Sequence, residues 1–326
     1  MKKYDVVGIG SPILDFIYEI EDYMLEEFGL RKGEMKSIST IESQKIFNRL
    51  NKYIPEIAPG GSAANVAAGV CCLGGKSAFF GKLGNDKYAE IYIKKTKEHG
   101  VEAFFSKNKD EITGHAITLI TPDFERTFAV NLGAAILFDK NDLSEDILLQ
   151  SKILHIEGFQ LEDIQLRETA LSAMAFAKQN NVLVSLDLSD PALIKRNLLT
   201  LKDIVRENVD ILFANEVEAN SFTKKSPEEA VIEMEKICKI AIVKIGEKGS
   251  LIRKDNKTFK ISPRKVNVVN TNGAGDMYAA GILFGISNNL DIEKSGNLAS
   301  YVSSLVVEVK SARIEKSLKE DIKKLI

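Results

Sequence analysis

The residues of this chain best suited to chemistry lie late in the sequence, at positions 270–276 (NTNGAGD). A β-rich run precedes them at 259–269, and the small, apolar, proline-free run at 277–284 predicts a buried helix. A glycine-rich turn that enters a helix leaves backbone N–H groups free at the positive end of the helix dipole, where anions bind. Asp276, in the first helical turn, would stand beside that anion as a base for phosphate transfer to a hydroxyl. Spacing alone leaves a second interpretation open, because an acid in a first turn is also a common partner of the helix dipole.

A second acid follows the first predicted strand. The apolar run at 4–10 predicts a buried strand, and residues 10–15 (GSPILD) place Asp15 just beyond its end. Open α/β sheets bind ligands at the carboxyl ends of their strands, and a solvated turn acid is the alternative interpretation. The segment is not a dinucleotide fingerprint, because Ile13 occupies the third glycine position and Pro12 would sit in the tight turn.

Twin glycines open a third stretch, residues 59–65 (PGGSAAN). The pattern predicts a helix capped by Ser62, with Asn65 three residues later at the inner face of the turn. Gly60 and Gly61 permit a close approach of the backbone to a ligand, or a hinge. A well-capped buried helix without a ligand is the alternative.

Two more stretches follow predicted strands in the second half of the chain. Residues 215–218 (NEVE) have the spacing of a capping box, with Asn215 as the cap and Glu218 three residues later. A cap at the carboxyl edge of a sheet also faces the ligand, so the structural and functional interpretations are compatible. Gly246 and Gly249 lie in a strand–turn–strand segment at 244–251, where two glycines need no function.

The elements that must position these residues alternate between strand and helix after residue 139. This order predicts right-handed crossovers and a mostly parallel sheet in one large α/β domain. The predicted strands are 153–157, 182–188, 211–214 and 240–245, and the predicted helices are 165–179, 198–206 and 227–238. An amphipathic surface helix is predicted at 315–326.

Several short β-like runs predict a small sheet set apart from the main one. They are 16–20, 34–39, 101–105, 115–120 and 126–130. A sheet inserted into an α/β domain and covering its ligand edge would act as a lid. We therefore expect a single domain over residues 1–326, with a lid formed from about 16–39 and 101–130.

The composition is that of an ordinary soluble globular protein, with 44% hydrophobic and 28% charged residues. A net charge of −2 does not favour nucleic acid or an anionic membrane as a partner. No window reaches 18 apolar residues, and the first residues do not resemble a signal peptide. The three cysteines form no metal pattern and are predicted to be buried free thiols, which implies a reducing compartment. We expect a cytoplasmic protein.

Five motifs, in this order, resemble those of the ribokinase-like (PfkB) carbohydrate and nucleoside kinases. They are residues 10–15, 59–65, 126–131, 215–218 and 270–276, so the resemblance covers nearly the whole chain. The chain is more similar to adenosine kinases than to sugar kinases of this family. The resemblance implies a three-layer α/β/α domain with a mostly parallel central sheet and a small β-sheet lid.

The resemblance also implies roles for individual residues. Asp276 would be the catalytic base, and the backbone of Gly273, Ala274 and Gly275 would form the anion hole. The implied substrate-binding residues are Asp15, Gly60, Gly61, Asn65, Asn131 and Phe159. The residues implied to contact ATP or its phosphates are Arg126, Asn215, Glu218, Gly246, Gly249 and Thr271, of which Asn215 and Glu218 would position Mg²⁺ through water.

The implied reaction is transfer of the γ-phosphate of ATP, with Mg²⁺, to a primary hydroxyl such as the 5′-OH of adenosine. A sugar kinase acting on fructose, ribose or a related sugar is one alternative, and a non-catalytic nucleoside- or sugar-binding protein is another. Some members bind a monovalent cation near the last motif, where this chain has Asn270 in place of the usual Asp. Members of the family are monomers or pair through their lids as homodimers.

Overall fold

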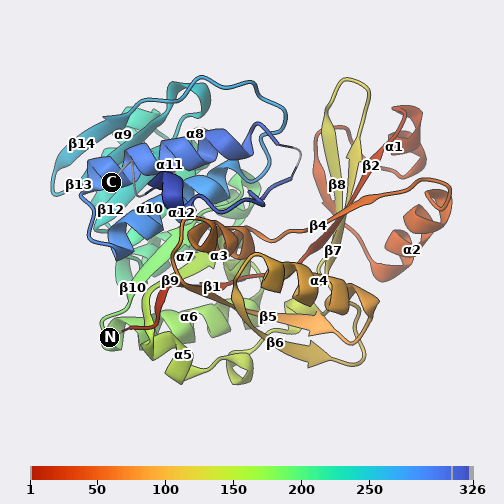
Figure 1. Cartoon of the computed structure of the whole chain (residues 1–326), viewed down its shortest axis with the longest axis horizontal. Helices are drawn as coiled ribbons and strands as arrows, with labels where there is room; N and C mark the ends of the chain where they lie inside the picture. Colours follow the sequence, from red (N-terminus) through yellow and green to blue (C-terminus); the bar gives the residue numbers. More distant parts are fainter. Residues whose placement is uncertain (1, 310, 323–326) are drawn as a thin grey trace.

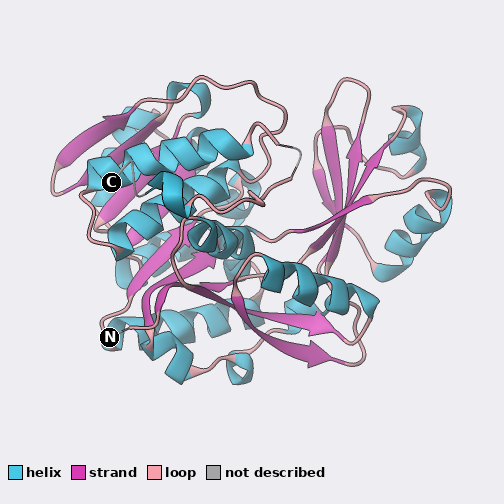
Figure 2. Cartoon of the chain, viewed as in Figure 1, coloured by secondary structure: helices cyan, strands magenta, loops and turns pink. Residues whose placement is uncertain are grey.

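The computed structural model describes residues 2–309 and 311–322, which form two β-sheets surrounded by helices (Figure 1, Figure 2). The strands of the large sheet are β1 (Tyr4–Ile9), β5 (Ser77–Gly84), β6 (Glu102–Asn108), β9 (Ser151–Glu157), β10 (Leu183–Asp187), β11 (Ile211–Asn215), β12 (Ile240–Lys244), β13 (Ser250–Lys254) and β14 (Lys257–Ile261). Their spatial order is β14-β13-β12-β11-β10-β9-β1-β5-β6. All neighbours from β12 to β6 pair in parallel, and only the pairs β12–β13 and β13–β14 are antiparallel. The predicted mostly parallel sheet is confirmed.

Helices cover both faces of the large sheet, because its central strands are continuous apolar runs with no solvent-facing side. One face packs against α3 (Ser62–Cys72), α10 (Ala274–Ser287), α11 (Ile292–Val306) and α12 (Lys319–Ile322). The other face packs against α5 (Glu145–Leu149), α6 (Ile164–Gln179), α7 (Pro191–Asn208), α8 (Glu216–Thr223) and α9 (Pro227–Glu235). The result is a three-layer α/β/α domain.

The small sheet forms a separate lobe, at the right of Figure 1. Its strands are β2 (Leu14–Glu19), β3 (Met35–Ser37), β4 (Glu56–Pro59), β7 (His115–Ile120) and β8 (Arg126–Asn131), in the order β3-β8-β7-β2-β4. One face is apolar and packs against α1 (Tyr23–Glu27), α2 (Thr40–Arg49) and α4 (Lys87–Glu98). Because side chains alternate along a strand, the residues between those core positions face the opposite way.

Three details of the predicted organisation are wrong. The strand expected at 101–105 in the small sheet is β6 instead, an edge strand of the large sheet that pairs with β5. The small sheet takes β4 in its place, and this short strand was not predicted. The β-rich run expected at 259–269 ends as a strand at Ile261, because Pro263 cannot donate to a sheet ladder.

The C-terminal helix is shorter than predicted within the described residues, where it covers only Lys319–Ile322. Residues 323–326 of the prediction lie outside the described part of the chain. None of the helices formed by residues 2–309 and 311–322 is long and apolar enough to span a membrane.

Candidate active site

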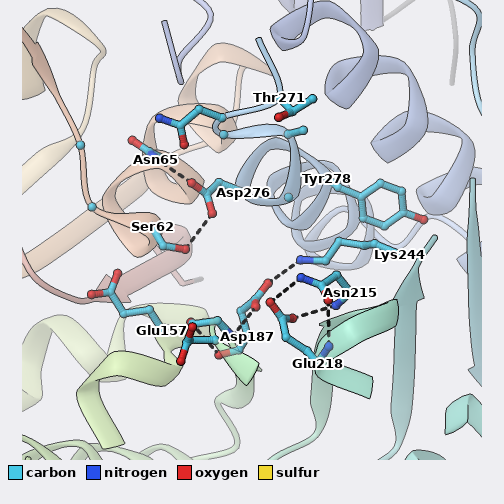
Figure 3. Close-up of a pocket in the computed structure, with 18 of the residues that line it drawn as sticks. Ser62, Asn65, Glu157, Asp187, Asn215, Glu218, Lys244, Thr271, Asp276 and Tyr278 are labelled. Carbon is cyan, nitrogen blue, oxygen red and sulfur yellow. Dashed lines mark hydrogen bonds and ion pairs between the residues drawn. The ribbon is translucent and has the colours of Figure 1, made fainter. Parts of the chain in front are cut away.

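The candidate site is a cavity of about 1840 Å³ between the carboxyl ends of the large-sheet strands and one face of the small sheet. Figure 3 shows residues on its large-sheet side. The large sheet contributes a row of polar residues from four neighbouring strands, Glu157, Asp187, Asn215 and Lys244. They align because parallel strands end at the same edge, and register pairs Asp187 with Glu157 and Asn215 with Lys244. The loop before α10 and the first turns of α3 and α10 also line the cavity.

Asp276 lies in the first turn of α10, as predicted, and two side chains from α3 hold its carboxylate. Ser62 Oγ donates to Oδ1 at 2.7 Å, and Asn65 Nδ2 donates to Oδ2 at 2.8 Å. Burial raises the pKa of Asp276, while the hydrogen bonds from Asn65 and Ser62 act in the opposite direction. The carboxylate is therefore fixed in orientation and has a proton affinity above that of an ordinary aspartate.

The turn before Asp276 depends on glycine. Gly273 precedes the helix with a φ of 79°, in the left-handed region, and an added Cβ would collide with the carbonyl oxygen of Ala312. The N–H of Ala274 donates to the carbonyl of Thr271 at 3.2 Å. The N-terminus of this 14-residue buried helix faces the cavity, which suits it to binding an anion.

The twin glycines position α3 in a different way from the one predicted. The residue that caps α3 is Gly61, with a φ of 90°, and Ser62 is the first helical residue. The prediction of Ser62 as the cap is wrong because its hydroxyl donates to Asp276 instead of accepting from a backbone N–H. A side chain at position 61 would collide with the carbonyl of Ser11, so only glycine fits here.

A buried arginine fixes the amide of Asn65. Arg313 is 1% exposed, and its Nε donates to Asn65 Oδ1 at 2.8 Å. Its Nη2 also donates to the carbonyl of Gly60 at 3.2 Å. Because the guanidinium has only donors, it orients the oxygen of Asn65 toward itself and the nitrogen toward Asp276. Arg313 and Asn65 therefore connect the carbonyl of Gly60 to the carboxylate of Asp276 through three hydrogen bonds.

The predicted capping box is confirmed and faces the cavity. Asn215 Oδ1 accepts from the N–H groups of Val217 and Glu218 at 2.9 and 2.8 Å, and Glu218 Oε2 accepts from the Asn215 N–H at 2.7 Å. Burial, followed by the charge of Asp187, raises the pKa of Glu218 to about 7. Carboxylate and amide oxygens are the ligands that Mg²⁺ prefers, so Asp187, Asn215 and Glu218 are the residues here that could hold a magnesium through water.

Glu157 anchors the opposite end of the row. It accepts from the N–H of Ser11 at 2.9 Å and from the N–H of Ala63 at 2.8 Å, which joins β9 to the segment after β1 and to α3. Burial raises the pKa of Glu157 to about 7. This carboxylate holds the twin-glycine region in place and lines the cavity.

The structure brings together most of the residues that the sequence analysis singled out. Those that line the cavity are Asp15, Gly60, Gly61, Asn65, Phe159, Asn215, Glu218, Gly246, Gly249, Thr271, Gly273, Ala274, Gly275 and Asp276. Asn131 is not among them: its side chain accepts from the N–H of Gly133 and donates to Thr40. Its neighbours Val130 and Leu132 form that part of the wall instead.

Arg126 also lies outside the lining but on the face of β8 that is turned to the cavity. It shares this face with Phe128 and Val130, which both line the cavity, because side chains two residues apart point the same way. Its Nη1 is buried and has no hydrogen-bond partner among the described residues.

Residues 54–319 match the pfkB family carbohydrate kinase. The chain belongs to the pfkB family of carbohydrate kinases. Curated relatives of this pfkB kinase include the 5-dehydro-2-deoxygluconokinase of Clostridium perfringens, 27% identical over 339 residues that cover 100% of this chain and 93% of the relative. The adenosine kinase of Saccharomyces cerevisiae is 25% identical over 328 residues, covering 93% of this chain and 94% of the relative.

Solved structures agree with the ribokinase-like fold. The adenosine kinase from Sinorhizobium meliloti superposes with a TM-score of 0.92 at 30% identity, over 99% of this chain and 100% of that one. A probable sugar kinase from Rhizobium etli CFN 42 superposes with a TM-score of 0.93 at 30% identity, over 100% of both chains. The predicted family, fold and enzyme class, a phosphotransferase with an alcohol acceptor, are confirmed. The relatives' names divide between nucleoside and sugar substrates.

The acceptor side of the pfkB kinase's cavity, next to the small sheet, is mainly apolar. Its apolar lining residues are Ile13, Met35, Phe128, Val130, Leu132, Ile136, Phe159 and Leu166. The acids beside them are Asp15, Glu162 and Asp163, and Arg196 Nε pairs with Glu162 at 2.8 Å. Burial raises the pKa of Asp15 to about 7, although the charges of Arg313 and Arg126 lower it.

Sequence analysis missed four residues of this site, Glu157, Asp187, Lys244 and Arg313. The first three each end a strand that it predicted, so a charged residue closing an apolar run was an available signal. Arg313 lies in an irregular segment, where no periodicity or motif marks it.

Proposed function

We propose that this pfkB kinase transfers the γ-phosphate of ATP to the primary hydroxyl of a nucleoside such as adenosine. The observation that carries the proposal is the composition of the acceptor side, where eight apolar residues line the cavity together with Asp15. A nucleobase offers a flat apolar surface, and the ribose hydroxyls can donate to a carboxylate. The carboxylate of a sugar acid would instead lie among Asp15, Glu162 and Asp163, where like charges repel.

In the proposed reaction, Asp276 accepts the proton of the 5′-OH as that oxygen attacks the γ-phosphorus in line. The new bond joins the 5′-oxygen to the phosphorus, and the bond to the bridging oxygen breaks, so that ADP leaves. The N–H groups of Gly273 and Gly275 stabilise the negative charge that develops on the phosphoryl oxygens, and that of Ala274, which donates to Thr271 in this structure, joins them when phosphate binds. Ser62 and Asn65 keep the carboxylate of Asp276 aimed at the hydroxyl.

The small sheet supplies the acceptor wall and, in this proposal, closes as a lid that excludes water. Gly60 and Gly61 join its strand β4 to α3 and would act as the hinge. Arg126 would approach the phosphates on closure. Asn215 and Glu218, with Asp187, would hold Mg²⁺ through water, and the ion would neutralise phosphate charge.

A sugar kinase of the same family is the second candidate. It is favoured by the relatives named 5-dehydro-2-deoxygluconokinase and by Arg126, a cavity-facing cation with an unpartnered buried nitrogen among the described residues. That guanidinium could accept a sugar carboxylate. A non-catalytic binding protein would have no need of the restrained carboxylate of Asp276.

The test is ATP consumption with Mg²⁺ in the presence of one acceptor at a time, at equal concentrations. The acceptors are adenosine, inosine, guanosine, cytidine, ribose, fructose and 5-dehydro-2-deoxygluconate. We expect the highest turnover with a nucleoside. Turnover with a sugar or sugar acid alone would overturn the nucleoside assignment, and no turnover with any acceptor would overturn the kinase reaction at this site.

A further inference from the structure

Lys244 is a largely buried cation in the wall of the cavity, and none of the motifs contains it. It ends β12, and its side chain is 16% exposed. Its Nζ donates to Asp187 Oδ2 at 2.8 Å, across the intervening strand β11. An ammonium has three donors, and Asp187 is its one hydrogen-bond partner among the described residues. Two N–H groups therefore remain available to a ligand.

The ammonium lies against the helix N-terminus that suits an anion. A Cβ placed on Gly275 would lie 3.1 Å from Lys244 Nζ, so the missing side chain at this position leaves room for the lysine. In Figure 3 the Nζ lies between Asp276, above, and the pair of Asp187 and Glu218, below. A phosphoryl group bound by the backbone of residues 273–275 and facing Asp276 would come within reach of it.

Lys244 offsets negative charge in this part of the wall. This part of the wall otherwise carries Asp187, Glu218 and Asp276. Polyphosphate entering among these acids would be repelled unless a cation offset them.

We propose that Lys244 is a catalytic residue whose ammonium donates to a non-bridging oxygen of the γ-phosphoryl group during transfer. This inference rests on the proposed function in so far as ATP occupies the cavity. In the structure the ammonium is paired with Asp187; with ATP bound, its remaining N–H groups contact the phosphoryl oxygens. A fixed donor aimed at the place where charge develops stabilises the transition state more than the ground state.

The main experiment compares Lys244→Met with Lys239→Met. Lys239 lies just before the other end of β12, and its side chain, 72% exposed, forms an ion pair with the buried Asp210 at 2.8 Å. Its replacement therefore also removes a lysine–aspartate pair, but an exposed lysine away from the cavity. Calorimetric titration with AMP, ADP and ATP in the presence of Mg²⁺ needs no acceptor. We expect Lys244→Met to weaken ATP binding about 10- to 100-fold and leave AMP binding unchanged. Equal loss for AMP and ATP, or no loss, would overturn the proposal.

Turnover provides the second readout. Lys244→Met should lower kcat about 100- to 1,000-fold, while Lys239→Met should retain the kcat of the unmodified protein. Near-full turnover of Lys244→Met would contradict a catalytic role. If the unmodified protein binds ATP but phosphorylates no acceptor, the proposed function fails, while the AMP-to-ATP comparison still decides the role of Lys244.

A double variant tests whether Lys244 binds phosphate or only neutralises the charge of Asp187. Asp187→Asn/Lys244→Met leaves no buried charge unpaired at this pair, so it should fold even if the single lysine variant does not. We expect its ATP affinity to stay below that of Asp187→Asn alone by about the same 10- to 100-fold factor. ATP affinity equal to that of Asp187→Asn would show that Lys244 only balances the aspartate.

Discussion

The two walls of the cavity differ in how their polar groups are held. On the large-sheet wall, Asp276, Asn215 and Glu218 each have hydrogen-bond partners within the protein. On the small-sheet wall the surface is mainly apolar. Asp15 lines the cavity there, and Arg126 lies just outside the lining with an Nη1 that has no hydrogen-bond partner among residues 2–309 and 311–322. The polar groups of the large-sheet wall are held in place without a ligand, whereas those of the small-sheet wall remain available to hydrogen-bond with one.

This difference separates reaction from specificity. Groups that stabilise a transition state must be fixed in advance, because any reorganisation would add to the barrier. Groups that select a substrate can remain unsatisfied until the right molecule pairs with them, and a molecule that leaves them unpaired is rejected. Changes in the large-sheet wall should therefore alter kcat, and changes in the small-sheet wall should alter discrimination between acceptors.

The largest effect is expected from removing the base. Asp276→Asn should lower kcat by about two to four orders of magnitude, because the amide cannot accept the hydroxyl proton. ATP affinity, measured by calorimetry, should change little. Ser62→Ala, which removes one hydrogen bond to the same carboxylate, should cost far less. Near-full turnover of Asp276→Asn would exclude Asp276 as the base and remove the contrast between the walls.

An intermediate effect is expected at Asp15. Asp15→Asn should lower kcat/KM for adenosine about 10- to 100-fold, because a neutral amide accepts ribose hydroxyls less strongly than a carboxylate. The KM for ATP should be unchanged. Asp110→Asn, an exposed residue between β6 and β7, is the matched control and should leave both constants unaltered. A loss of ATP binding in Asp15→Asn would show that Asp15 contacts ATP and not the acceptor, against the prediction.

The same variant should be more stable than the unmodified protein at high pH. Burial raises the pKa of Asp15 to about 7, above its unfolded value, so ionisation costs folding free energy as pH rises toward 7. Asp15→Asn removes that cost. Its Tm should exceed that of the unmodified protein by roughly 1–3 °C at pH 8, and the difference should shrink as pH falls from 7 toward 4. A difference independent of pH would contradict this explanation.

The smallest effect on turnover is expected at Phe159, an apolar residue of the acceptor side in the segment that directly follows the large-sheet strand β9. Phe159→Ala should raise the KM for adenosine about tenfold by removing an apolar surface for the base, with the KM for ATP unchanged. Phe124→Ala is the matched control, since Phe124 is 84% exposed in the turn between β7 and β8. A larger effect at Phe124 than at Phe159 would show that the turn, and not the acceptor side, binds the base.

The sequence predicted the chemical groups of the large-sheet wall better than it predicted which strands form the small sheet. Residues 270–276 and 215–218 are local motifs, and their geometry follows from helix ends that need partners. The contacts that complete the wall are not local: Lys244 pairs with Asp187 across 57 positions, and Arg313 reaches Asn65 across 248. No spacing rule within one element reveals contacts of this kind.

The small sheet was partly misassigned for a related reason. Strand β6 is half-exposed along its length, as an edge strand is, so its pattern resembles that of a lid strand. Strand β4 has only four residues and ends in a proline, which gives too short a pattern to detect. Sheet membership was decided by pairing over long sequence distances, which alternation within one strand does not specify.

The most direct test of the central claim is a competition between two acceptors in one reaction. Adenosine and 5-dehydro-2-deoxygluconate are supplied at equal concentration with limiting ATP and Mg²⁺, and both phosphorylated products are quantified. Their ratio equals the ratio of the two kcat/KM values, independent of enzyme concentration. We predict about 100-fold or more adenosine 5′-phosphate than phosphorylated sugar acid, because the acids of the acceptor side repel the carboxylate of the sugar acid. A product that is mainly the phosphorylated sugar acid would contradict the nucleoside assignment.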